Sequence, residues 1–148
     1  MTRFVGAIVI GYLVMLIVVF AMFMASYPLL GVDRLFEPGS FEAARGWIVL
    51  SLVIGLFAAM SGGATCARIA PGTSAPRWLA AIVLILGALM AIPVAMSASP
   101  SRGGVRPPNS TMAEAMSHAE QPLWVAVLNP LVGALGVLMG AGPPSRRR

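Results

Sequence analysis

The chain has 148 residues, of which 58% are hydrophobic and only 10% are charged. This composition excludes a soluble globular domain, because the surface of a soluble domain needs more charge. The formal net charge of +5 comes from ten basic residues, all arginine and scattered over several short segments. We expect these arginines to meet anionic lipid headgroups and to set the topology, with no nucleic acid as a partner.

Four apolar stretches that contain no Asp, Glu, Lys, Arg or His organise the chain. At a rise of ~1.5 Å per residue, a helix of about 20 residues covers the ~30 Å hydrocarbon core of a bilayer. The pattern predicts an all-α integral membrane protein, a four-helix bundle that forms a single domain over residues 1–148 and is surrounded by membrane lipids. The expected spans are Phe4–Tyr27, Trp47–Ala67, Trp78–Ser97 and Pro122–Ala141.

The distribution of charge orients this bundle. The N-terminus, the segment between the second and third spans and the C-terminal tail hold six arginines and no acid, whereas segments 28–46 and 98–121 hold all five acids and four arginines. The positive-inside rule therefore predicts cytoplasmic termini, with segments 28–46 and 98–121 outside. Aromatic residues at the span ends should lie at the headgroup level; they are Tyr27, Trp47, Trp78 and Trp124.

The connecting segments carry turn and cap signals. Pro38-Gly39 predicts a turn, and Ser40 is a suitable N-cap for a helix from about Phe41 into the second span. The short Pro/Gly-rich middle segment predicts a tight hairpin of the second and third spans. Thr111-x-x-Glu114 matches a capping box and predicts a short interfacial helix over about 111–121. Its apolar face would hold Met112, Ala115, Met116 and Ala119.

Small residues recur at a spacing of four and would let helix backbones approach closely. Packing inside the bundle is the favoured interpretation, above all for the second and third spans as a hairpin. The alternative is oligomerisation or docking onto another membrane protein. These residues are Gly55, Ala59 and Gly63 in the second span, Gly87, Ala91 and Ala95 in the third, and Gly136 and Gly140 in the fourth.

One polar patch interrupts the apolar spans. Pro93 and Pro130 lie inside the third and fourth spans, where each removes a helix hydrogen bond and frees a carbonyl group. Asn129 is the most polar side chain in any span. The patch predicts either a small cavity that opens outward, lined by Asn129 and the freed carbonyls under the 111–121 helix, or simple helix bends with Asn129 bonded across helices.

The expected outer face offers Glu114, His118 and Glu120 as candidate interaction residues, with Glu114 and His118 at the spacing of a modest surface pair. His118 should point away from the neighbouring methionines, so no metal site is expected. Cys66 is the single cysteine, which excludes an intrachain disulfide. The run Gly62–Ala70 around it is similar to runs in small bacterial membrane proteins. That resemblance carries no catalytic or binding residue. We expect the chain to lie in a plasma or inner membrane.

The sequence holds no nucleophile with a nearby base, no phosphate-binding loop and no ionisable residue within a span. We therefore expect no enzyme activity and no cofactor. The expected function is a non-catalytic structural or accessory subunit, or an assembly partner, that binds another membrane protein or forms a homo-oligomer. The alternative is an oligomeric transporter or channel for a neutral or lipidic solute that uses the region of Pro93, Asn129 and Pro130.

Overall fold

The computed structural model describes residues 1–97, 107, 110–111, 114 and 117–143. Its long helices confirm the predicted all-α four-helix bundle, since four of them are long and apolar enough to cross a membrane. Each begins and ends within a few residues of its predicted span. They are α1 (Thr2–Leu30), α3 (Arg45–Ile69), α4 (Ala75–Ser97) and α6 (Leu123–Ala141), and a short α2 (Val32–Leu35) follows α1.

Helix is the conformation that apolar surroundings require, because it pairs each backbone N–H and C=O group within the segment. Two of the helices end at a glycine whose positive φ no other residue adopts easily. Gly31 has a φ of 69° and its N–H donates to the Tyr27 carbonyl at 3.1 Å. Gly142 has a φ of 70° and donates to the Met139 carbonyl, also at 3.1 Å.

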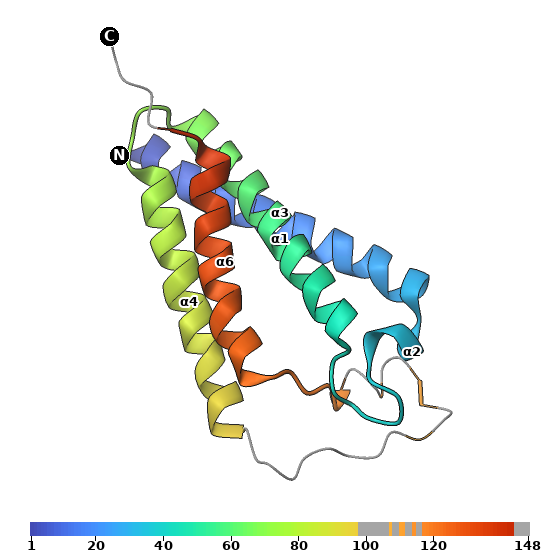
Figure 1. Ribbon diagram of the computed structural model, residues 1–148. Coiled ribbons are helices and arrows are strands. Elements are labelled where there is room, and N and C mark those ends of the chain that lie inside the picture. Colours follow the sequence, from blue (N-terminus) through green and yellow to red (C-terminus); the bar gives the residue numbers. More distant parts are fainter. Residues whose placement is uncertain (98–106, 108–109, 112–113, 115–116, 144–148) are drawn as a thin grey trace.

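The order of the helices in space differs from their order in the sequence. Helix α3 packs along both α1 and α6, and α4 packs along α6, whereas α4 makes few contacts with either α3 or α1 (Figure 1). The predicted tight hairpin of the second and third spans is therefore wrong in its packing: the turn after Ala70 is short, but α4 lies against α6. The reason is the close fit between α4 and α6 at Gly87 and Pro130.

The two ends of the bundle differ. The N-terminus, the α3–α4 turn and the end of α6 lie at one end, here called the terminal end, while α2 and the segment that leads into α6 lie at the other, the loop end (Figure 1). The main core is built of small side chains from all four helices and includes residues near the terminal end. Its buried members are Ala7, Ala59, Cys66, Ala70, Ala75, Leu79, Ala80 and Val137.

Large apolar side chains cover the outside of the bundle. Ile17 and Phe20 on α1 are each 66% exposed, and Met90 on α4 is 70% exposed. In water this surface would be unfavourable, whereas in a bilayer the hydrocarbon chains surround it at no cost. The exposure pattern therefore agrees with a protein embedded in lipid.

The segment before α3 folds back on itself at the loop end. Phe36 and Ala43 form an antiparallel bridge around the Pro38-Gly39 turn. The helix expected from Phe41 is wrong, because α3 begins only at Arg45. Backbone pairing explains the difference: the Glu37 N–H donates to the Glu42 carbonyl at 2.9 Å, and the Ser40 hydroxyl oxygen accepts the Glu42 N–H at 3.1 Å.

The segment before α6 forms backbone hydrogen bonds with the folded-back segment before α3. Glu120 donates its N–H to the Phe41 carbonyl at 3.0 Å, and its carbonyl accepts the Ala43 N–H at 3.1 Å. The predicted cap is present, since the Glu114 N–H donates to the Thr111 hydroxyl oxygen at 3.3 Å. Glu114 and Ser117 are helical, but the chain is no longer helical at Ala119, so the helix ends before the predicted residue 121. Three residues of its expected apolar face, Met112, Ala115 and Met116, lie outside the described residues.

Aromatic side chains join α1 to α3 at the loop end. The Trp47 ring lies 5.5 Å from the Phe23 ring and 5.3 Å from the Tyr27 ring, measured between centroids. Trp78 and Trp124 are 58% and 55% exposed, as side chains at a headgroup level would be. Trp47 therefore has a packing role that its position at a span end does not predict.

Candidate cleft between α1 and α4

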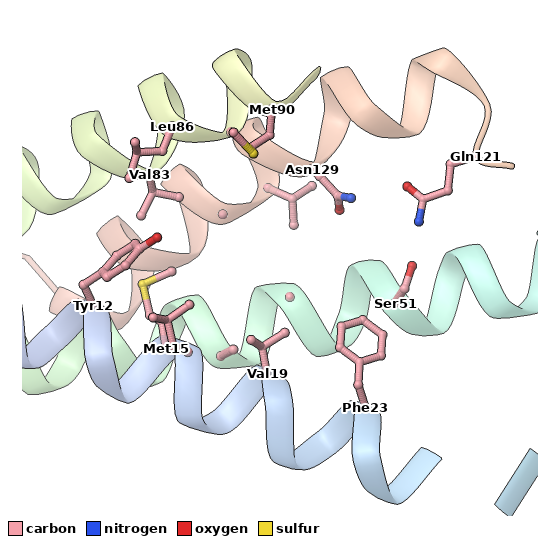
Figure 2. Close-up of a pocket in the computed structure, with 16 residues that line it drawn as sticks. Tyr12, Met15, Val19, Phe23, Ser51, Val83, Leu86, Met90, Gln121 and Asn129 are labelled. Atoms are coloured by element: carbon pink, nitrogen blue, oxygen red, sulfur yellow. The ribbon is translucent and has the colours of Figure 1, made fainter. Parts of the chain in front are cut away.

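A cleft of about 450 Å³ lies between α1 and α4, with α3 and α6 as its floor. Figure 2 shows the side chains that surround it, with Tyr12 at one end and Gln121 at the other. Its walls are mainly apolar, and none of the described residues that form them is charged. The lining residues are Tyr12, Met15, Leu16, Val19 and Phe23 from α1, Ser51, Gly55 and Ala58 from α3, Val83, Leu86, Gly87 and Met90 from α4, Asn129, Val132 and Gly133 from α6, and Gln121.

The cleft exists because the helices are tightly packed at the terminal end and less tightly elsewhere. A Cβ atom at Gly62 would clash with Met15 and would lie 2.6 Å from the Gly11 carbonyl oxygen, so α1 and α3 touch through their backbones there. About two turns nearer the start of α3, a Cβ atom at Gly55 would meet nothing within 4 Å. Gly55 therefore forms part of an open floor.

Four polar side chains interrupt the apolar lining. The Ser51 hydroxyl donates to the Ile48 carbonyl within its own helix at 2.8 Å. The Asn129 and Gln121 amides project into the same space (Figure 2), and within the described part of the chain neither makes a hydrogen bond. Tyr12 lies deeper, toward the terminal end. Three of the four polar side chains thus lie toward the loop end of the cleft, here called its mouth, and the Tyr12 hydroxyl lies toward the other end.

The structure brings only part of the predicted proline and asparagine patch together. Asn129 lines the cleft, and Asn129 and Pro130 also line an adjoining hollow of about 380 Å³ with Ala126, whose carbonyl Pro130 leaves free. Pro130 is buried, and a Cβ atom at Gly87 would lie 2.6 Å from its Cγ. Pro93 is exposed and lines neither space.

Two small residues of the predicted stripe on α3, Ala59 and Gly63, face α6. A Cβ atom at Gly63 would clash with the Val137 carbonyl, and one at Gly140 would clash with the Met60 carbonyl. Gly136 lies against Ala59, which is fully buried. Ala59 and Gly63 thus pack inside the bundle, against the fourth span and not against the third. On α4, Gly87 packs against α6, Ala91 is partly buried, and Ala95 is exposed.

The candidate outer-face residues lie together at the loop end. His118 Nδ1 lies 3.1 Å from the Glu114 carbonyl oxygen and 3.0 Å from the Ser117 hydroxyl, and its ring lies tilted beside the Phe41 ring, with 5.2 Å between the centroids. The contact at this i,i+4 spacing is thus made by the backbone of Glu114. Among the described residues no group of three His, Cys, Asp or Glu is placed to hold a metal ion.

Sequence reasoning found Asn129 but missed the other groups of the cleft. Gln121 precedes Pro122 outside the predicted span, and Ser51 and Tyr12 are individually ordinary residues of apolar helices. The spacing of small residues on the second span predicted close packing at Gly55, whereas in the structure Gly55 faces the cleft. Comparisons with known protein families, with curated proteins and with solved structures give no match.

Proposed function

We propose that this protein is a non-catalytic accessory subunit or assembly partner of another membrane protein, with both termini cytoplasmic and the loop end outside the plasma or inner membrane. The charge distribution described above supports the orientation. A binding role is supported by the small residues and the hydrogen-bonding amides that the described helices and the segment before α6 present.

The observation that carries the proposal is a row of three alanines on α4, here called the small-residue face, which the bundle leaves largely uncovered and which the exposed Ile85 and Ile92 flank. Ala88 and Ala95 are exposed and Ala81 is partly buried, and their spacing of seven places them on one side of the helix. In lipid, large apolar side chains give no reason for helices to associate, whereas small residues allow close backbone contact. This side of α4 suits a partner helix.

The experiment is extraction of the native protein in a mild detergent, followed by mass spectrometry of the intact assembly. We expect a partner protein at fixed stoichiometry. Ala88→Trp should remove the partner, while Phe20→Trp, a bulky residue at an exposed position of α1, should retain it. A homo-oligomer without a partner, unchanged by Ala88→Trp, would contradict the proposal.

The cleft favours a second candidate function, a carrier or channel for a neutral or lipidic solute. It is of a size common for small-molecule sites, which span about 300–1,000 Å³, and it presents unpaired amides in an apolar surrounding. Purified protein in liposomes would then move a neutral solute across the bilayer. Solute flux no faster than through protein-free liposomes would rule this candidate out.

A further inference from the structure

We propose that the cleft binds a neutral amphiphile with one apolar chain, whose uncharged hydrogen-bonding head lies at Asn129 and Gln121 and whose chain extends toward Tyr12. This inference goes beyond the accessory role and does not depend on a protein partner. It gives a chemical class to the solute of the second candidate function.

The head must be polar, because the mouth of the cleft holds amides that lack partners. Asn129 lies two turns inside α6, in a segment that we place in the membrane, and hydrocarbon would leave its donor and acceptor groups unsatisfied. Gln121 projects into the same space from the segment before α6 (Figure 2). An ester, hydroxyl or amide head can accept from one amide and donate to the other.

The head must also be uncharged. Among the residues that the structure describes, no Asp, Glu, Lys, Arg or His lines the cleft, so a charged head would be desolvated without an opposite charge from them to compensate it. The lining therefore selects against a fatty acid or a phosphate ester at this position, although such molecules have similar chains.

The tail must be apolar and flexible. Beyond Asn129 the walls are formed by Val19, Leu86, Met90 and Val132. The unbranched methionine side chain can change its conformation to fit an irregular apolar chain at little cost in free energy. A chain could enter sideways from the bilayer, because α1 and α4 make few contacts with each other.

A small molecule fits this cleft better than a partner helix does. A partner helix would need a groove open along the bundle, but α1 meets α3 and α4 at the terminal end: a Cβ atom at Gly11 would lie 3.0 Å from Cys66 Cβ, from the Gly62 carbonyl oxygen and from Leu79 Cδ2. The cleft is closed there, as a site for a chain of limited length should be.

The test uses the full-length protein in lipid nanodiscs and three photoreactive probes with the same chain: a monoacylglycerol, a fatty acid and a hydrocarbon without a head. We expect the monoacylglycerol to label α1 and α4 peptides that contain Val19 and Met90, saturably and in competition with unlabelled monoacylglycerol. Equal labelling by all three probes, or saturable labelling of these peptides by the fatty acid alone, would overturn the proposal.

Variants with matched controls sharpen the test. Gly55→Leu should block labelling by filling the floor, whereas Gly6→Leu should not, although a Cβ atom at either glycine meets nothing within 4 Å. Asn129→Leu should weaken competition by about five- to tenfold, the change expected for a lost hydrogen bond, and the exposed Val127→Leu should not. Labelling unchanged by Gly55→Leu would overturn the proposal even where Asn129→Leu fails to fold. A second protein cross-linked to the lining residues of the cleft would also overturn it, because the cleft would then belong to a protein partner.

Discussion

Gly63 on α3 lies directly against the backbone carbonyl of Val137 on α6, with no room for a Cβ atom between them. Gly140 makes the reciprocal approach from α6 to the Met60 carbonyl. These two contacts bring the helices together backbone to backbone, where dispersion and weak C–H···O contacts replace the hydrophobic effect that lipid does not supply. They make α3 and α6 the central pair of the bundle.

Gly63→Ala should therefore destabilise the protein by about 1–3 kcal/mol, the range for overpacking in a tight core. Its matched control is Gly55→Ala on the same helix, where a Cβ atom would meet nothing within 4 Å and the higher helix propensity of alanine should leave stability equal or slightly raised. Thermal unfolding in one detergent measures both. Equal melting temperatures for the two variants would contradict the role given to the α3–α6 contact.

Trp47 should matter more to folding than the other two tryptophans. Its ring pairs with Phe23 and Tyr27, and aromatic pairs contribute about 0.5–1.5 kcal/mol each beyond the area they bury. Trp47→Ala should thus lower the unfolding temperature clearly, and Trp124→Ala, at a residue 55% exposed, should change it little. The reverse order of effects would show that interfacial anchoring outweighs packing at this end.

The orientation can be tested by labelling introduced cysteines. In a Cys66→Ala background, Ser117→Cys should react with a membrane-impermeant maleimide added outside intact cells, because Ser117 is exposed at the loop end. Thr73→Cys, exposed in the α3–α4 turn, should react only after the membrane is opened. The opposite pattern would reverse the topology, and with it the side from which the cleft is reached.

The sequence predicted the four helices well because their signal is local: each is a long run without charge, and hydrocarbon admits few other conformations. It could not predict which helices pack together, since this depends on where small residues face. The sequence shows that Gly55, Ala59 and Gly63 are small and lie on one side of their helix. It does not show that Ala59 and Gly63 meet α6 while Gly55 meets nothing within 4 Å.

The candidate site was predictable only in part for a similar reason. Asn129 is conspicuous in an apolar span, so composition alone singles it out. Gln121 and Ser51 come from a connecting segment and another helix, and only the packing of α3 against α6 places them near Asn129. The helix expected from Phe41 failed because long-range backbone bonds to Glu120, invisible in a local pattern, fix an extended conformation.

The central claim, that α4 docks another membrane protein through its small-residue face, is tested most directly by a photo-cross-linking amino acid at Ala88 in the native membrane. With the amino acid at Ala88, the account predicts a covalent adduct with one protein, the same partner that is found in the intact assembly. With the amino acid at Phe20 instead, it predicts adducts with lipid and none with protein. Lipid adducts alone at both positions would contradict it.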